Sequence, residues 1–113
     1  MSLIIYHNPK CSKSRATLAL LHERGLEPQV IEYLKDPPSV EQLKTILGML
    51  GTKPRELLRP REAHEAGLDD PTLSDDAIIA GMVDHPIVIE RPIVIAGDRA
   101  RLGRPPESVL EIV

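Results

Sequence analysis

The first 32 residues alternate between strand-like and helix-like runs, and this order restricts the fold more than any other feature of the chain. An apolar run at Leu3–His7 is ended by Asn8-Pro9, and a helix is expected from Ser12 to about Arg24. Gly25 stands where helices favour a C-terminal cap, and a second short strand is expected around Val30-Ile31. Two strands joined by a helix form a parallel pair with a right-handed crossover. The chain is therefore predicted to begin with a β-α-β unit.

The middle of the sequence is predicted to be helical. Asp36-Pro37-Pro38 interrupts the backbone, and Ser39–Gln42 is a capping-box pattern that opens a helix. Another helix is expected after Ser74, and it must end before His85-Pro86. The shorter elements predicted between them are a short helix near Pro54 and mostly loop or short helical turns over residues 60–73.

The last third returns to strand-like patterns. Ile93–Ile95 is expected to be a buried strand, Gly97-Asp98 a hairpin turn and Ala100–Leu102 the returning strand. A closing helix is expected after Arg104–Glu107.

The predicted order is β-α-β, a helical insertion at about residues 37–85, and then β-β-α, all within one domain covering residues 1–113. This α/β order, with a cysteine at the start of the first helix and an Xaa-Pro before the third strand, is the plan of a thioredoxin-like fold. The analogy suggests a cis peptide bond at Arg91-Pro92, although few X-Pro bonds are cis.

Composition narrows the class of protein. A formal net charge of -3 argues against a nucleic-acid binder that depends on phosphate contacts. The N-terminus has no signal-peptide pattern, and no apolar run approaches the ~20 residues of a membrane helix. A lone cysteine offers no internal disulfide framework. We therefore expect a cytoplasmic protein without a nucleic-acid or membrane partner.

Cys11, the only cysteine, lies in the predicted turn between the first strand and the first helix. There the amides and the positive dipole end of the helix stabilise a thiolate. Lys10, Lys13 and Arg15 add positive charge nearby. Because its neighbours are polar and turn-forming, a reactive thiol is favoured over a buried, inert one. Without a second cysteine, any disulfide that Cys11 forms must be with another molecule.

Ser14 and His7 are candidates for tuning the pKa of this thiol. Ser14 stands three positions after Cys11, where a C-x-x-C motif holds its resolving cysteine. Its hydroxyl cannot form a disulfide, but it can donate a hydrogen bond to the thiolate. An ordinary first-turn serine is an equally good interpretation. His7 ends the first strand, where it either lowers the thiol pKa by charge or hydrogen bonding, or simply packs.

Three arginines directly precede prolines near the ends of predicted elements: Arg59, Arg91 and Arg104. A single arginine is usually a solvated surface residue. An arginine held against a proline is presented more rigidly, and rigid guanidiniums suit bidentate recognition of a tetrahedral oxyanion. These three are the candidate anion-binding residues.

Other common kinds of site do not match the sequence. One cysteine and scattered histidines give no zinc spacing, and no phosphate-binding or dinucleotide glycine pattern occurs. A cysteine-phosphatase loop needs an arginine six positions after the cysteine, where this chain has Thr17. We expect no metal and no bound cofactor.

Four separated motifs, in order, resemble the glutaredoxin-coupled arsenate reductase family. They are Tyr6–Arg15, Glu56–Arg59, Glu90–Val94 and Arg101–Glu107. The resemblance covers essentially the whole chain. The best-known members of the family carry a longer C-terminal tail, so this chain is most similar to the shorter, housekeeping-type branch of the family. It implies a thioredoxin-like fold with a helical insertion, and Cys11 as the nucleophile. The residues implied to bind the oxyanion are Arg59, Arg91 and Arg104, and those that match positions near the reactive thiol are His7, Ser14 and Arg15.

The implied reaction is the reduction of arsenate, or of a similar oxyanion. The Cys11 thiolate attacks arsenic while the arginines stabilise the oxygens. Glutathione as co-substrate and glutaredoxin as partner supply the thiols that the chain lacks. Two alternatives stay open: a glutathione-linked thiol reductase with another substrate, and a non-catalytic regulator of the Spx type that binds RNA polymerase. Spx-type proteins often carry C-x-x-C, so Ser14 argues weakly against the second.

Overall fold

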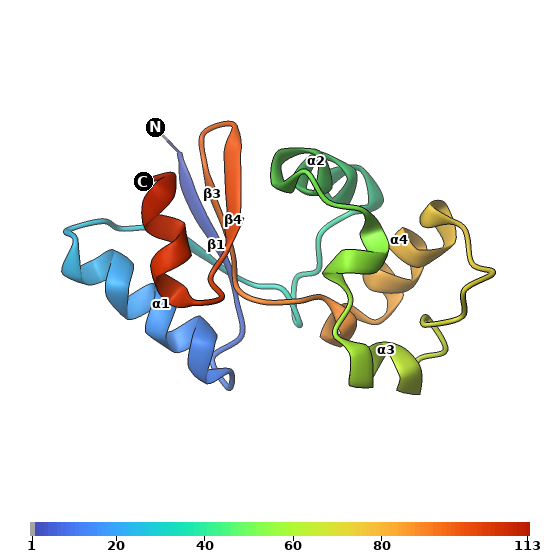
Figure 1. Cartoon of the computed structure of the whole chain (residues 1–113). Coiled ribbons are helices and arrows are strands. Elements are labelled where there is room, and N and C mark those ends of the chain that lie inside the picture. Colours follow the sequence, from blue (N-terminus) through green and yellow to red (C-terminus); the bar gives the residue numbers. More distant parts are fainter. Residues whose placement is uncertain (1) are drawn as a thin grey trace. The chain divides into compact units, whose positions relative to one another are not determined.

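The computed structural model describes residues 2–113, which form two compact units (Figure 1). The first unit combines the chain up to Asp36 with Arg91–Val113, and the second is Pro37–Glu90. The chain thus enters the second unit after Asp36 and returns to the first unit at Arg91. This boundary matters because Arg91 is one of the candidate site residues.

The first unit is built on a four-stranded sheet with the strand order β2-β1-β3-β4. β1 pairs parallel with β2 and antiparallel with β3, which pairs antiparallel with β4. Ile5, in the central strand, lies opposite Val30 on one side and Val94 on the other, and its side chain is fully buried. The strands are β1 Leu3–His7, β2 Gln29–Glu32, β3 Ile93–Ala96 and β4 Arg99–Leu102.

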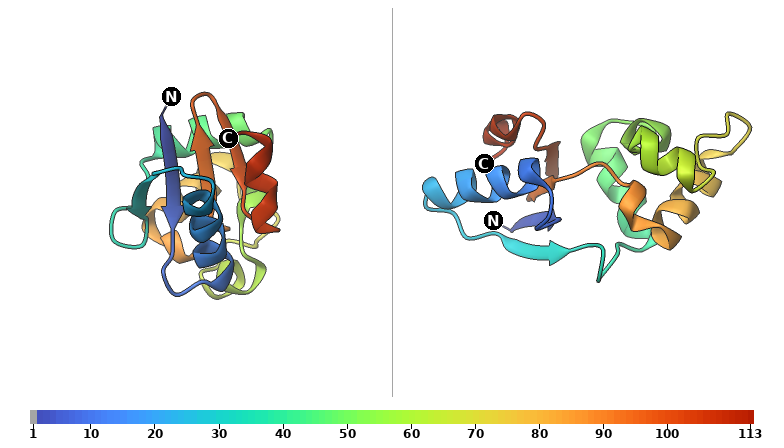
Figure 2. Two further views of the ribbon diagram at one scale, coloured as in Figure 1. Left: turned by 90° about the vertical axis from the view of Figure 1, so that its left-hand side faces the viewer. Right: turned by 90° about the horizontal axis from the view of Figure 1, so that it is seen from below.

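Helix α1 (Ser12–Glu23) and the 3₁₀ helix η3 (Pro106–Glu111) pack together on one face of this sheet (Figure 2). Each large aliphatic side chain buried there stabilises the fold by about 1.5–3 kcal/mol. The predicted β-α-β and β-β-α order is confirmed, and with it the thioredoxin-like arrangement. The buried core between these layers consists of Ile5, Leu21, Val94, Ala96, Val109 and Ile112.

The second unit is helical, and its two main helices begin at the predicted caps. The Ser39 hydroxyl accepts a hydrogen bond from the Gln42 N–H at 3.1 Å, and the Gln42 side chain accepts one from the Ser39 N–H at 2.8 Å. The Ser74 hydroxyl accepts from the Ala77 N–H. Pro60–Glu65 forms a short helix in a segment predicted as mostly loop or short helical turns. The elements are α2 Val40–Leu50, η1 Pro54–Leu57, α3 Pro60–Glu65, α4 Asp75–Asp84 and η2 Pro86–Val88.

Residues 57–59 and 88–90 of the second unit run antiparallel beside each other, and the chain returns to the first unit directly after residue 90. Leu58 and Ile89 form an antiparallel bridge. The Arg59 N–H donates to the Val88 carbonyl at 2.8 Å, and the Glu90 N–H donates to the Leu57 carbonyl, also at 2.8 Å. These bonds fix Arg59 against the strand-like segment that ends at Glu90.

Two prolines that follow candidate arginines have cis peptide bonds. The bond at Arg91-Pro92 is cis, which confirms the prediction, and the bond at Arg104-Pro105 is also cis, which was not predicted. Across residues 2–113, no helix has both the length and the apolar character needed to cross a membrane.

Candidate active site

Asn8 shapes the turn that carries the cysteine. Its side-chain oxygen accepts a hydrogen bond from the Lys10 N–H at 3.0 Å, and its carbonyl accepts one from the Cys11 N–H at 3.0 Å. Asn8 is buried, and its own N–H donates to the Ser14 hydroxyl. The sequence pattern did not single out Asn8 as a site residue. The signal was the Asn8-Pro9 pair, because an asparagine followed by proline favours turn initiation.

The Cys11 thiol stands at the N-cap of α1 and is partly exposed. Burial raises its pKa, but hydrogen bonds from the Ser14 N–H, the Arg91 side chain and the Lys13 N–H together outweigh burial. The positive charge of Arg91 acts in the same direction. The pKa of Cys11 is therefore held below its ordinary value. The donors in the first turn of a helix have no partner within the helix, so they are free to stabilise the thiolate.

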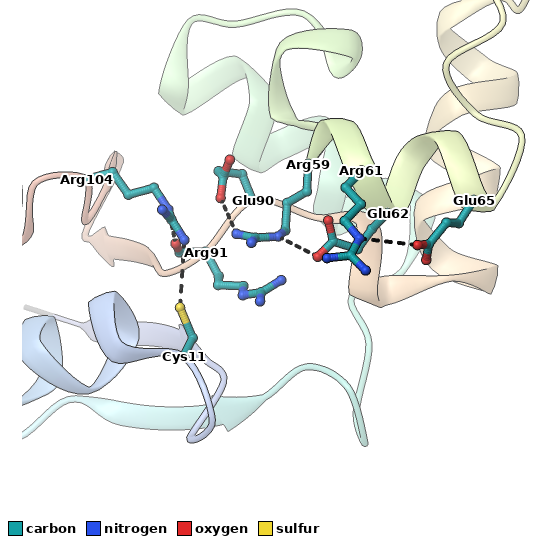
Figure 3. Close-up of polar contacts among 8 residues, drawn as sticks. All are labelled: Cys11, Arg59, Arg61, Glu62, Glu65, Glu90, Arg91 and Arg104. Atoms are coloured by element: carbon teal, nitrogen blue, oxygen red, sulfur yellow. Dashed lines mark hydrogen bonds and ion pairs between the residues drawn. The ribbon is translucent and has the colours of Figure 1, made fainter.

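Arg104 contacts this sulfur (Figure 3), and Arg91 is the second candidate arginine that acts on the thiol. Arg104 donates from Nη2 to Cys11 Sγ at 3.7 Å, and from Nε to the Arg91 carbonyl at 2.7 Å. Arg91 is buried and hydrogen-bonds the thiol through its side chain. The structure therefore brings Cys11, Arg91 and Arg104 together, although Arg104 is 93 residues from Cys11 in the sequence.

Gly103 allows the segment carrying Arg104 to lie close to α1. A Cβ at this position would lie 2.7 Å from Pro92 Cγ and would overlap the Thr17 hydroxyl. Thr17 is fully buried, and its hydroxyl donates to the Lys13 carbonyl at 2.8 Å. The Gly103 N–H also donates to the Pro92 carbonyl. Gly103 was missed from the sequence, where its signal was a glycine directly before a candidate arginine.

His7 and Ser14 form a buried polar pair beneath the turn. The Ser14 hydroxyl is 2.7 Å from His7 Nδ1, and it accepts a hydrogen bond from the Asn8 N–H at 3.0 Å. The Ser14 hydroxyl thus engages His7 and Asn8, while the Ser14 main-chain N–H engages the sulfur. Neither of the two interpretations drawn from spacing described this arrangement.

The pKa of His7 lies below its ordinary value. Burial is the largest cause, and Arg15 adds to it, whereas Glu32 opposes it. The lowered pKa favours the neutral ring, which argues against positive charge as the means by which His7 acts on Cys11. The contact of His7 near the cysteine turn is its hydrogen bond with the Ser14 hydroxyl.

Arg15 braces the turn. Its guanidinium donates to the Pro9 carbonyl at 2.9 Å, and its main-chain N–H donates to the Cys11 carbonyl at 3.0 Å. Both bonds hold the backbone on either side of the thiol.

Arg59 belongs to the second unit, where it is the N-cap of α3. Its Nε donates to Glu62 at 3.1 Å, and its Nη1 donates to Glu90 at 2.8 Å. Burial lowers the pKa of the guanidinium, but the two carboxylates outweigh burial and raise it above the ordinary value. The part of Arg59 in anion binding stays a prediction.

The lowered pKa of Cys11 predicts that its alkylation sets in at a lower pH than that of an ordinary thiol. Because the thiolate is the nucleophile, its reaction rate with iodoacetamide should reach half its maximum at a lower pH in the folded protein than in the urea-unfolded chain. Arg91→Ala should move the folded midpoint to higher pH, since it removes a hydrogen bond and a positive charge. Identical midpoints for folded and unfolded protein would contradict the assignment.

Comparisons with known proteins identify the same family over nearly the whole chain. The ArsC family model matches residues 6–112. The chain is 54% identical to the uncharacterized protein YfgD of Escherichia coli, covering 96% of this chain and 94% of YfgD. It is 47% identical to the arsenate reductase of Haemophilus influenzae, with 100% of both chains covered. The solved arsenate reductase from Vibrio cholerae superposes with a TM-score of 0.95 at 56% identity, covering 100% of this chain and 98% of the other. The match over residues 6–112 and the full-length relatives, together with the thioredoxin-like sheet, show that this chain belongs to the ArsC family.

Proposed function

We propose that this protein reduces arsenate to arsenite, with Cys11 as the nucleophile. The observation that carries the proposal is the pair of guanidiniums at a thiol whose pKa is lowered: Arg91 hydrogen-bonds the sulfur, and Arg104 lies 3.7 Å from it. A tetrahedral oxyanion that approaches this sulfur meets two fixed positive charges, which suit its oxygens. Relatives named arsenate reductase support the choice of arsenate.

The reaction starts with attack of the Cys11 thiolate on arsenic(V), which forms a sulfur–arsenic bond and releases water after an arsenate oxygen has taken up protons. Arg91 and Arg104 stabilise the negative charge that the remaining oxygens carry. Glutathione then forms a second sulfur–arsenic bond and displaces another water. A glutaredoxin thiol attacks the glutathione sulfur, and the bonding pair stays on arsenic. Arsenic(III) is thereby released from glutathione, the two external thiols leave as a mixed disulfide, and hydrolysis returns Cys11 and arsenite.

The single cysteine supports the use of external thiols. Two electrons must come from two sulfur atoms that end as a disulfide, and no second cysteine exists in the chain. A cavity of about 220 Å³ also borders the cysteine turn, next to the end of β2. Lys10 and Lys35 are among the residues that line this cavity, and their ammonium groups suit the carboxylates of glutathione. We assign Arg59 to oxyanion binding on its motif alone, Glu56–Arg59.

The decisive experiment is a coupled assay with arsenate, glutathione, glutaredoxin, glutathione reductase and NADPH. We expect NADPH oxidation that depends on arsenate and stops when either glutathione or glutaredoxin is left out. No turnover at millimolar arsenate, while Cys11 is still alkylated rapidly at neutral pH, would favour a thiol reductase with another substrate. Capture of RNA polymerase without any thiol chemistry would favour a regulator.

Arg91→Ala should raise the KM for arsenate far more than Arg99→Ala. Arg91 is buried at the thiol, whereas Arg99 is exposed at the start of β4 and serves as the matched control. Loss of a charge-assisted hydrogen bond to the oxyanion should raise KM about ten- to hundredfold. Steady-state kinetics over a range of arsenate concentrations would measure both variants, and equal effects would remove the case for a specific anion site.

A further inference from the structure

The guanidinium of Arg59 is held by two carboxylates that come from different segments (Figure 3). Glu62 is in the first turn of α3 and lies 3.1 Å from Nε, whereas Glu90 lies 31 residues away in the sequence and 2.8 Å from Nη1. The three side chains are only 21–22% exposed. Solvent therefore screens these two ion pairs less than it screens a surface pair.

The neighbouring ion pair of α3 provides the contrast. Arg61 lies 3.4 Å from Glu65, and their side chains are 88% and 64% exposed. An exposed ion pair of this kind contributes little to stability and restrains its arginine side chain only weakly. The start of α3 thus has one partly buried arginine, Arg59, and one exposed arginine, Arg61, so the ion pair of Arg61 is a matched control for the ion pairs of Arg59.

The main chain reinforces the contact between Arg59 and Glu90. The antiparallel bridge between Leu58 and Ile89 places the two segments beside each other, with 2.8 Å hydrogen bonds on both sides of it. Glu90 is also the residue directly before Arg91, whose side chain hydrogen-bonds Cys11. The Glu90 carboxylate therefore links Arg59 to the chain one residue before an arginine of the candidate site.

Charge alone gives no reason for this arrangement at an anion site. The negative charges of Glu62 and Glu90 each oppose the attraction between the Arg59 guanidinium and an oxyanion. A guanidinium has five N–H donors, and the carboxylates of Glu62 and Glu90 engage two of them. Among the hydrogen bonds of residues 2–113, this leaves three N–H donors of Arg59 for a ligand. A long side chain also loses rotamer freedom when it binds, and this loss is smaller when the side chain is already restrained.

We propose that Glu90 is a positioning residue that orients the Arg59 guanidinium for the oxyanion. The proposal rests on the proposed function, because the part of Arg59 in anion binding belongs to it. Glu90 acts through its hydrogen bond to Nη1, and the benefit of a fixed orientation exceeds the repulsion from its negative charge.

Two opposing effects make the test sharp. If Glu90 acted only through its charge, removing that charge would tighten arsenate binding and lower KM. If Glu90 positions Arg59, losing the hydrogen bond would raise KM. Glu90→Gln removes the charge but keeps an acceptor oxygen, Glu90→Asp keeps the charge but shortens the side chain, and Glu90→Ala removes both.

We expect Glu90→Ala to raise the KM for arsenate about tenfold while kcat changes much less, because misplacing a positioning group mainly weakens productive binding. Glu90→Asp should raise KM in the same direction, and Glu90→Gln should stay within about threefold of the unmodified protein. Glu65→Ala should have no effect. A lower KM in Glu90→Ala, or equal values for Glu90→Ala and Glu65→Ala, would overturn the proposal. Glu90→Asp decides the question if Glu90→Ala does not fold.

A double-mutant cycle with Arg59→Ala tests whether Glu90 acts through Arg59. Glu90→Ala should add nothing once Arg59 is gone, and a full additional effect would contradict the proposal. Protection of Cys11 from iodoacetamide by arsenate alone, without glutathione, separates the two levels of failure. Absence of both protection and turnover in the unmodified protein overturns the proposed function and this inference together. Equal protection in the unmodified protein and in Glu90→Ala overturns the inference alone.

Discussion

Replacing Cys11 with serine is expected to abolish arsenate-dependent NADPH oxidation while the protein stays folded. The N–H donors and arginines at this position lower the pKa of the Cys11 thiol and so favour the thiolate, whereas a serine hydroxyl is far too weak an acid to ionise there. Serine is also a favoured N-cap residue, so α1 should keep or gain stability. The coupled assay measures activity, and thermal unfolding measures the fold.

Ser12→Ala is the matched control for this variant, because Ser12 is exposed and lies next to Cys11. It should keep most of the activity. If Cys11→Ser kept more than about a thousandth of the turnover, the nucleophile would have to be another group. If Cys11→Ser lost its cooperative unfolding, the loss of activity would reflect the fold and not the chemistry.

Gly103→Ala is expected to lower the free energy of unfolding by about 1–3 kcal/mol, the range typical of overpacking a buried site. The added methyl group would meet the rigid ring of Pro92 at 2.7 Å and would overlap the buried Thr17 hydroxyl. Neither neighbour is the free end of a flexible side chain, so the end of β4 must move. Because the next residue is Arg104, turnover should fall as well. Urea unfolding and the coupled assay would measure the two effects.

Gly48→Ala is also a glycine-to-alanine substitution, but it is expected to raise the free energy of unfolding. Gly48 lies inside α2, and a Cβ there would have no atom within 4 Å apart from its chain neighbours and the helix's own backbone. Alanine is favoured over glycine inside a helix, so this variant should be more stable by up to about 1 kcal/mol. If Gly103→Ala unfolded at the same urea concentration as the unmodified protein, the close packing at Gly103 would not restrict the fold.

Much of the secondary structure could be predicted because its signals are local. The cap at Ser39 depends on Gln42 three residues away, and the cap at Ser74 depends on the next turn. The secondary structure of residues 60–73 was harder to predict, because prolines, a glycine and aspartates in this segment are compatible with both loop and helix. Pro60 is tolerated in the first turn of a helix, and α3 begins there.

The polar contacts around the thiol were less predictable. Ser14 and His7 were both singled out, but spacing could not show that they contact each other at 2.7 Å. That contact depends on how the end of β1 lies against the first turn of α1. Asn8 and Gly103 carry no reactive group, and their contributions, a hydrogen-bonded turn and a close packing contact, depend on residues that only the fold brings near them.

By itself, the sequence determined that one cysteine would stand at the start of a helix after a strand and that any disulfide it forms is intermolecular. Both follow from local order and from a residue count. Only the tertiary structure decided which arginines reach that cysteine. Arg91 comes from the entry to β3 and Arg104 from the exit of β4, so pairing of β3 with β1 and β4 brings both to the end of β1. Such contacts join residues 80 or more positions apart, and no local preference in the chain encodes them.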